Sequence, residues 1–204
     1  MDKENLLKSL SMKINECKRC SLWKNAFHAV PGEGNPDAKV LFLGEAPGFH
    51  EDQQGRPFVG QAGKLLTSIL ELTGVKRDQV FITNVIKHRP PDNRDPSQNE
   101  IGSCNIWIDS QIEIIKPKVI VTLGRYSLNK FLPPSKISNV HGKPIKLSSK
   151  VILPMYHPAA ALRSESIAGQ LKRYFQINED LLKDPDNEIG KISKEADENQ
   201  MSLF

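Results

Sequence analysis

The chain has 204 residues, a hydrophobic content of 38% and a formal net charge of +4. This length fits one domain with or without a tail, and no apolar run approaches the roughly 18 residues that a membrane helix needs. The basic net charge is a weak indication of a polyanionic partner, because many basic proteins bind no nucleic acid. Because the charged N-terminus lacks an apolar signal core, we expect a cytoplasmic protein, and we expect it to be a monomer.

Short apolar runs alternate with amphipathic segments along the chain. In chain order, the predicted elements are a helix at 2–16, a strand at 39–44, a helix at 60–74, a strand at 79–85, a helix at 97–117, a strand at 118–124, a helix at 125–131, a strand at 150–158 and a helix at 168–183. This alternation predicts an α/β fold, a three-layer sandwich with a central, mostly parallel four-stranded sheet flanked by helices.

The last part of the chain differs in composition from the rest. From Asp184 onward it is polar and charged, which is typical of disorder. We therefore expect one folded domain over residues 1–183 and a disordered tail over residues 184–204.

Each predicted strand is followed by polar residues or by residues with special backbone preferences. Taken singly, such stretches are often turns or helix caps. In a parallel sheet, however, the carboxyl ends of the strands meet at one edge, where ligands bind. The stretches are GEAPG (44–48), TNVIKHRPP (83–91), LGRYS (123–127) and YHPAAALR (156–163).

Three of these stretches, in this order behind an N-terminal CxxC, resemble the family-4 uracil-DNA glycosylases, the iron–sulfur members of the uracil-DNA glycosylase superfamily. GEAPG is followed by GRPFVG, then by TNVIKHRPP and HPAAALR. The resemblance covers roughly residues 14–182. It implies a monofunctional enzyme that hydrolyses the bond between uracil and deoxyribose, leaves an abasic site and initiates base excision repair. The nucleotide must first leave the DNA stack.

The resemblance also implies how uracil is recognised. Phe58 matches the family's stacking aromatic residue, and Asn84 matches the residue that reads the pyrimidine edge. An amide donates to O4 and accepts from N3–H at once, whereas cytosine reverses that pattern. Backbone amides at Ala46 and Gly48 would add donors. Glu51 matches a glutamate near the pyrimidine C5, where it would exclude the methyl group of thymine.

Two residues match the family's catalytic groups. His157 matches the histidine that donates to uracil O2, where negative charge gathers as the bond breaks. Glu45 would orient water and oppose the positive sugar. Some relatives place an aspartate for the water at the position of Ala46, which has no such group, so Glu45 or a substrate phosphate must orient the water. The alternative for Glu45 is a carboxylate that only fixes its loop.

Basic, aromatic and apolar residues near these motifs are candidates for DNA contact. The loop beyond the catalytic histidine corresponds to the family's wedge, which fills the gap left by a flipped base. For each single basic residue the alternative is a solvated surface charge. The candidates are Arg89, Arg94, Leu162, Arg163, Lys172, Arg173 and Tyr174.

Family members carry four cysteines that hold a 4Fe-4S cluster. Three of them match Cys17, Cys20 and Cys104, but the place of the other is taken by His88. Histidine serves as an iron–sulfur ligand in other proteins, so we interpret His88 as the remaining ligand. The alternatives are a Cys3His zinc site and a three-cysteine cluster with an open iron. A covalent-trapping branch has a similar Lys-His pair, but its basic insertion is absent here, so a nucleophile is not expected.

Two other function classes fit the sequence less well. A non-catalytic damage binder would lack Glu45 or His157, and a nucleotide hydrolase would need a P-loop or a magnesium site.

The tail ends in QMSLF, and Gln200, Leu203 and Phe204 resemble part of the peptides that dock on the sliding clamp. The alternative is a frayed terminus whose apolar residues are accidental.

Overall fold

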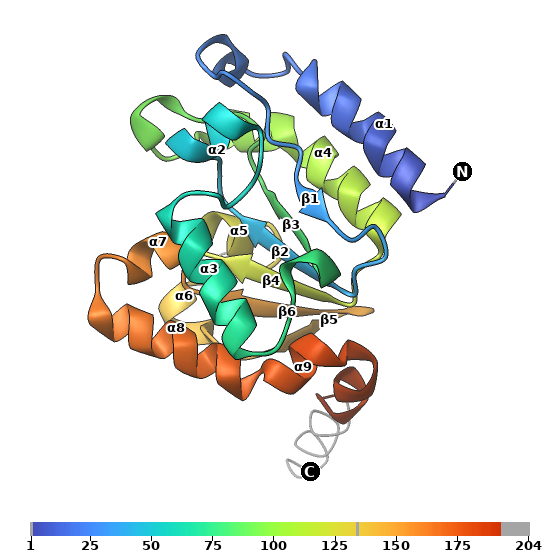
Figure 1. The fold of residues 1–204 in the computed structure, drawn as a ribbon, viewed down its shortest axis with the longest axis vertical. Helices are drawn as coiled ribbons and strands as arrows, with labels where there is room; N and C mark the ends of the chain where they lie inside the picture. The colour runs from blue at the N-terminus through green and yellow to red at the C-terminus, as the bar shows by residue number, and fades with distance from the viewer. Residues whose placement is uncertain (1, 134, 193–204) are drawn as a thin grey trace.

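The computed structural model describes residues 2–133 and 135–192 (Figure 1). It is an α/β fold whose mixed, mostly parallel sheet has six strands in the order β1-β3-β2-β4-β6-β5. The four inner strands β3, β2, β4 and β6 are parallel, while the edge strands β1 and β5 are antiparallel to their neighbours. The strands are β1 (Glu33–Gly34), β2 (Val40–Gly44), β3 (Phe81–Asn84), β4 (Val119–Leu123), β5 (Ile145–Leu147) and β6 (Lys150–Met155).

The prediction of a four-stranded sheet is therefore wrong in its strand count. The four predicted strands are the parallel centre, and the two edge strands were missed. β1 has two residues, one of them a glycine, and β5 has three residues that are mostly exposed. Neither is long enough to carry an apolar pattern, which is the signal that identifies a strand in sequence.

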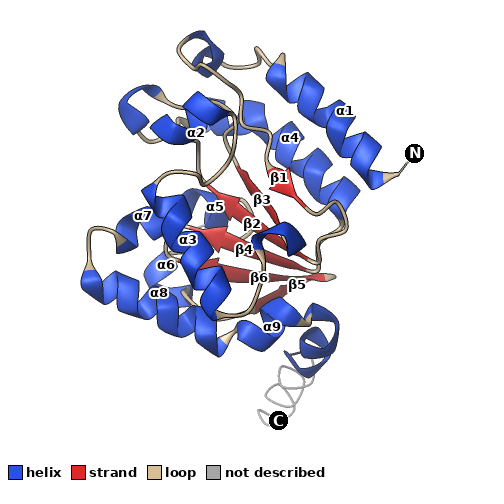
Figure 2. Ribbon diagram, in the orientation of Figure 1, coloured by secondary structure: helices blue, strands red, loops and turns tan. Residues whose placement is uncertain are grey.

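Helices cover both faces of the sheet (Figure 2). The capping box predicted at the start of the long central helix is present, since Ser97 and Glu100 bond each other's backbone N–H groups. The helices are α1 (Lys3–Asn15), α2 (Phe49–Gln54), α3 (Gln61–Leu72), α4 (Gln98–Ile115), α5 (Arg125–Asn129), α6 (Ile137–Val140), α7 (Pro158–Ala161), α8 (Glu165–Ile177) and α9 (Glu179–Lys183), with 3₁₀ turns η1 (Ser21–Lys24), η2 (Arg77–Gln79) and η3 (Pro91–Asn93).

Alternate residues of each inner strand enter different cores, because side chains of a strand point to opposite faces. On β2, Phe42 packs in a cluster with residues of α3 and α8. Its neighbours Leu41 and Leu43 pack in a second cluster with residues of α1 and α4. Both faces being covered explains why the inner strands are continuous apolar runs.

The folded part extends beyond the boundary expected at Asp184. Residues 185–192 are helical, Ile189 and Ile192 pack against the core, and Asp186 forms ion pairs with Lys39 and Lys118. The expected clamp peptide, Gln200 to Phe204, lies outside the described residues. Within residues 2–133 and 135–192, no helix is long and apolar enough to cross a membrane.

Candidate active site

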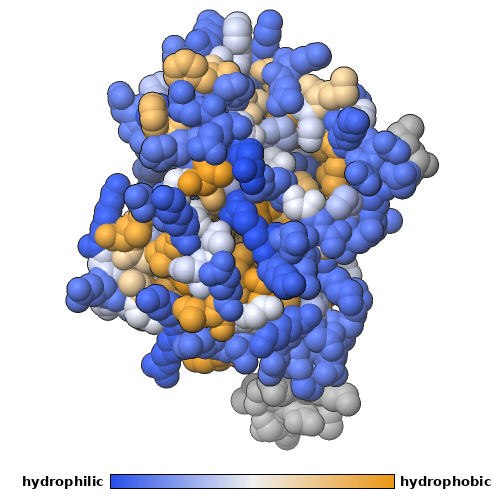
Figure 3. All heavy atoms as spheres, in the orientation of Figure 1, coloured by the Kyte–Doolittle hydropathy of each residue, from blue (hydrophilic) through white to orange (hydrophobic). Residues whose placement is uncertain are grey.

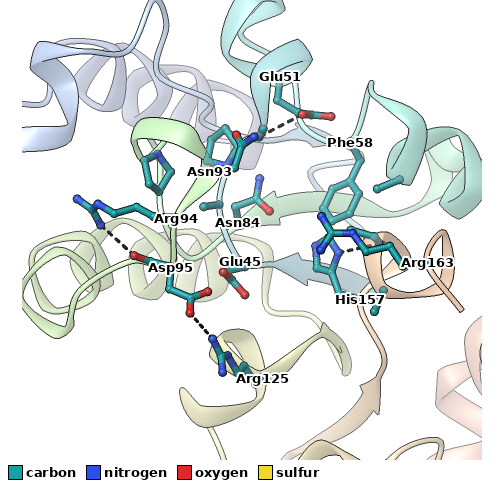
Figure 4. A pocket seen from close by; sticks show the side chains of 17 residues that line it. Glu45, Glu51, Phe58, Asn84, Asn93, Arg94, Asp95, Arg125, His157 and Arg163 are labelled. Atoms are coloured by element: carbon teal, nitrogen blue, oxygen red, sulfur yellow. Dashed lines mark hydrogen bonds and ion pairs between the residues drawn. The ribbon is translucent and has the colours of Figure 1, made fainter. Parts of the chain in front are cut away.

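A cavity of about 650 Å³ opens at the carboxyl ends of the inner strands, and we call it the strand-end cavity (Figure 4). Its wall comes from the ends of β2, β3, β4 and β6 and the segments that follow them, as the topology predicts. All of the predicted catalytic and uracil-binding residues line it, together with two of the predicted DNA contacts. These are Glu45, Ala46, Gly48, Glu51, Phe58, Asn84 and His157, with Arg94 and Arg163.

Phe58 lies under the strand-end cavity in a strained backbone conformation. Its φ of 51° is in the left-handed region, which bulky residues rarely adopt. Its ring is 5.7 Å from the ring of His157, with 27° between the planes. Gly44 makes this packing possible, because a Cβ there would lie 2.6 Å from the Phe58 ring and 2.2 Å from Asn84 Oδ1. The first glycine of GEAPG thus leaves room for the two recognition side chains.

Asn84 ends β3 and is 1% exposed. Its Oδ1 is buried without a hydrogen-bond partner among the described residues. Leaving a buried acceptor unsatisfied costs about 1–3 kcal/mol. Such a group at the wall of a cavity is suited to a ligand that brings a donor.

Lys87 supports Asn84 from behind and was not predicted as a site residue. The side chain is fully buried, and its Nζ donates to the Asn84 carbonyl at 2.8 Å, to Thr83 Oγ1 at 2.7 Å and to Gln111 Oε1 at 2.7 Å. Burial lowers the pKa of Lys87 to about 7. The ammonium group therefore ties the end of β3 to α4.

His157 precedes α7 and holds a defined tautomer. Its Nδ1 accepts a hydrogen bond from the Ala159 N–H at 3.1 Å. Burial lowers the pKa of His157 to about 4, although the nearby Glu51 acts in the opposite direction. The imidazole is therefore neutral near pH 7, and its proton resides on Nε2, the nitrogen left free to donate.

Glu45 is a carboxyl with an unusual charge environment. Burial raises the pKa of Glu45 to about 7, and the negative charge of Asp95 adds to this, while Arg125 opposes it. Asp95 and Arg125 form an ion pair at the strand-end cavity. Neither was predicted from sequence, although Arg125 lies in the LGRYS stretch that was singled out.

Both carboxylate oxygens of Glu51 accept hydrogen bonds from backbone N–H groups. Its Oε1 accepts from the N–H groups of Val59 and Gly60, both at 2.8 Å, and its Oε2 accepts from Gly48 N–H at 3.1 Å. Glu51 lines the strand-end cavity, as expected, but these contacts show that it also fixes the loops on either side of Phe58.

The predicted DNA contacts lie in different environments. Arg94 lines the strand-end cavity and donates to both oxygens of Glu100, at 2.9 and 2.7 Å. This pairing lowers the pKa of Glu100 to about 2. Arg163 lines the same cavity, and Leu162 beside it is exposed.

The candidates on α8 do not line the strand-end cavity. Lys172 and Arg173 are exposed. Tyr174 is half-buried, and its ring lies 4.8 Å from the ring of His141. A Cβ at Gly142, whose φ is +73°, would lie 2.1 Å from the Tyr174 ring. Tyr174 thus packs within the fold and is not at the cavity.

Cys17, Cys20 and Cys104 lie near one another. Burial raises the pKa of Cys104 to about 11, and Cys20 and Cys17 add to this rise. Burial raises the pKa of Cys20, and a hydrogen bond with Cys104 opposes this rise slightly. Trp107 Nε1–H donates to Cys17 Sγ at 3.2 Å. Ala46 of the strand-end cavity packs against the group that contains Cys20 and Cys104.

His88 is buried, and among the described residues Asp52 is the charged group that acts on its pKa. Burial lowers that pKa, and Asp52 opposes the effect. Within residues 2–133 and 135–192, no three His, Cys, Asp or Glu side chains are arranged around one metal ion. A 4Fe-4S cube distributes its ligands over four irons, so the neighbouring thiols are compatible with it.

Several known proteins are similar in sequence to this chain. A family model described as "Uracil DNA glycosylase superfamily" matches residues 31–182. The type-4 uracil-DNA glycosylase of Sulfurisphaera tokodaii is 48% identical over 180 residues, covering 83% of this chain and 82% of the relative. That of Thermotoga maritima is 44% identical over 174 residues, covering 84% and 90%. The type-5 uracil-DNA glycosylase of Pyrobaculum aerophilum is 28% identical, covering 78% and 81%.

An α/β fold with a strand-end cavity that presents an aromatic face, an amide and a neutral histidine is suited to a flat pyrimidine. Together with these relatives, it shows that the chain belongs to the uracil-DNA glycosylase superfamily and, within it, to the type-4 enzymes. The resemblance seen in the sequence is confirmed. The activity is hydrolysis of the N-glycosidic bond of uracil in DNA, which starts base excision repair. Type-4 membership also implies an iron–sulfur cluster.

Proposed function

We propose that the strand-end cavity takes the extrahelical uracil and that its wall performs the cleavage. The observation that carries this proposal is the Asn84 side chain, which is buried at the cavity with an acceptor that has no partner among the described residues. Uracil stacks on Phe58, its N3–H donates to Asn84 Oδ1, and the amide N–H donates to O4. Cytosine has no N3–H and carries an amino group at position 4, so it is rejected.

In this proposal His157 stabilises the leaving group. As the glycosidic bond breaks, negative charge gathers on uracil O2, and Nε2–H of the neutral imidazole donates to it. Because Nδ1 is held by the Ala159 N–H, the donor is oriented before the reaction begins. A preorganised donor of this kind contributes about 3 kcal/mol to the transition state.

Glu45 acts on the sugar side of the reaction. Its carboxylate stabilises the positive charge that develops on the deoxyribose, and it orients the attacking water. Ala46 has no side-chain group for this task, and we assign it to Glu45, with a substrate phosphate as the alternative. The raised pKa of Glu45 means that only part of the enzyme holds the active, ionised form near pH 7.

The test is excision from a uracil-containing oligonucleotide, followed by alkali to cut abasic sites. We expect activity in EDTA, since no motif supplies a divalent-metal site. Asn84→Ala should lose most of its kcat on uracil while the protein remains folded. A variant that cleaves uracil as fast as the wild type would overturn the assignment of the strand-end cavity.

We further propose that Cys17, Cys20 and Cys104 hold the cluster, with His88 as the remaining ligand. The proximity of the three thiols supports the cysteine part. The cluster would supply a covalent tie between the N-terminal segment and the start of α4, behind Ala46. Iron content and absorbance near ~400 nm test this: His88→Cys should keep the colour, and His88→Ala should bleach faster in air. A colourless protein with one zinc would favour Cys3His zinc.

The finer partner assignments are also proposals. We propose that a monomer binds single- or double-stranded uracil-DNA, and that Gln200, Leu203 and Phe204 dock on the sliding clamp. Truncation after Asn199 should abolish clamp binding in a calorimetric titration and leave excision from naked oligonucleotides unchanged. Equal clamp binding by both forms would dispose of the docking peptide.

A further inference from the structure

Phe49 is an exposed aromatic side chain beside the strand-end cavity. It begins α2 directly after Gly48, which lines the cavity, and it is 51% exposed. A single exposed apolar residue is common on protein surfaces and needs no explanation by itself. Phe49, however, lies next to the strand-end cavity and contacts a cation, and both features suit a nucleotide contact.

Arg89 and His50 hold the Phe49 ring in place. The Arg89 guanidinium lies over the ring, 5.3 Å from its centroid, and the His50 ring meets it edge-on at 5.5 Å. Arg89 is fixed in turn, because its Nε donates to Asn93 Oδ1 at 2.8 Å. Asn93 lines the strand-end cavity, and so does Pro90, the residue after Arg89. The aromatic ring and the cation are therefore ordered at the border of the cavity before any ligand arrives.

One carboxylate connects this exposed ring with the ring inside the cavity. Glu51 accepts from the N–H of Gly48, just before Phe49, and from the N–H groups of Val59 and Gly60, just after Phe58. Two aromatic side chains are thus held in one framework, one under the cavity and one at its border. Nucleotides that follow each other along a strand need such a pair of surfaces.

We propose that Phe49 and Arg89 form a second nucleotide subsite, which binds the nucleotide next to the flipped uridine. The neighbouring base loses its stacking partner when the uridine leaves the strand, and the Phe49 ring offers it an apolar surface. Arg89 supplies a positive charge for the adjacent phosphate. Stacking on an aromatic ring does not discriminate among bases, so this subsite is sequence-tolerant. It rests on the proposed placement of uracil in the strand-end cavity.

The experiment compares two single-stranded oligonucleotides that contain uracil. One carries normal bases on both sides of it, and the other carries abasic analogues there. Phe49→Ala should raise KM roughly tenfold on the first substrate, with kcat preserved, as loss of one stacked base predicts. On the second substrate the wild type should show the same rise, and Phe49→Ala should show no further change. Phe49→Trp should restore the wild-type KM.

Phe27→Ala is the matched control, since Phe27 is 71% exposed and does not line the strand-end cavity. It should leave both KM values unchanged. Inhibition by free uracil should be equal in the wild type and Phe49→Ala, because uracil alone occupies only the cavity. The subsite is rejected if Phe49→Ala keeps the wild-type KM, loses equally on both substrates, or binds free uracil more weakly. Failure of the cavity assignment would appear separately, as full activity in Asn84→Ala.

Discussion

Phe58, Asn84 and His157 form the floor of the strand-end cavity, and the Asp95–Arg125 ion pair lies at its rim (Figure 4). Phe58 and Asn84 are buried and His157 is half-buried, and none of the three carries a charge near neutral pH. The His157 ring is held by a backbone N–H group. The rim pair is exposed and joins a side chain of the loop before α4 to one at the start of α5. The floor thus matches a neutral base, while the rim matches a charged, solvated strand.

This difference shows how the site divides recognition from attraction. A neutral donor in a buried site interacts strongly with a developing anion, because little water screens it. Exposed charges are screened by salt and contribute little to fixed geometry. The Asp95–Arg125 pair has no net charge, so attraction of a polyanion at the rim depends on an exposed cation such as Arg163. Most of the face in Figure 3 is hydrophilic, with separate apolar patches, which fits the role of the outer surface.

The largest effect is expected at the floor. His157→Ala removes the donor to O2 and should lower kcat about a hundredfold or more. His141→Ala is a matched control, since His141 also accepts a backbone N–H at Nδ1 and has its pKa lowered to about 4 by burial. It does not line the strand-end cavity. Its kcat should be normal at temperatures where it is folded, whereas equal losses in both variants would contradict the role of His157.

The second-largest effect is a loss of stability, and we expect it on substitution of Lys87, which supports Asn84 from behind. Lys87→Met removes the lysine donor from the Asn84 carbonyl and from Thr83 Oγ1, while Gln111 Oε1 keeps a hydrogen bond from Thr83 Oγ1. Each of the two acceptors left without a donor costs about 1–3 kcal/mol, so we expect a loss of about 2–6 kcal/mol in the free energy of unfolding. Urea denaturation measures it. Lys172→Met, an exposed substitution, should change stability by less than about 0.5 kcal/mol. A similar small change in Lys87→Met would show that the network does not support the fold.

How much the sequence predicts differs between floor and rim. The floor residues follow strands or open helices within local motifs, and a parallel sheet brings strand ends to one edge. Asp95 and Arg125 are far apart in sequence and meet only because the loop before α4 folds over α5. Lys87 was missed for a similar reason, since a lysine at a strand end is usually solvated, and only the packed fold shows it buried.

The same distinction applies to the fold and to the cysteines. The inner strands are long apolar runs and were predicted, but β1 and β5 exist only as partners of β3 and β6. The proximity of Cys17 to Cys104 depends on the packing of α1 against α4, which residue spacing alone does not reveal. Whether His88 joins them stays a prediction.

The third effect connects rim and floor through Glu45. Because its pKa is raised to about 7 and the ionised form is the active one, kcat/KM should rise with pH through about 7 and then level off. Asp95→Asn removes a negative charge that raises this pKa, so the rise should move to lower pH, by roughly half a unit. Arg125→Ala removes an opposing positive charge and should move it to higher pH. If the wild type, Asp95→Asn and Arg125→Ala show the same dependence of kcat/KM on pH, the group that titrates is not Glu45.

The smallest effect is expected from a single rim charge. Arg163 lines the strand-end cavity and is exposed, so the contact with a DNA phosphate that we propose for it would be screened by salt. Arg163→Ala should weaken DNA binding only a few-fold, and the slope of log K against log salt should fall by about 1. Lys8→Ala on α1 removes an exposed charge that does not line the cavity and should leave the slope unchanged. Fluorescence anisotropy with a labelled oligonucleotide at several salt concentrations measures both. A change in kcat without a change in slope would instead assign Arg163 to the reacting base, and the contrast between floor and rim would then fail at this residue.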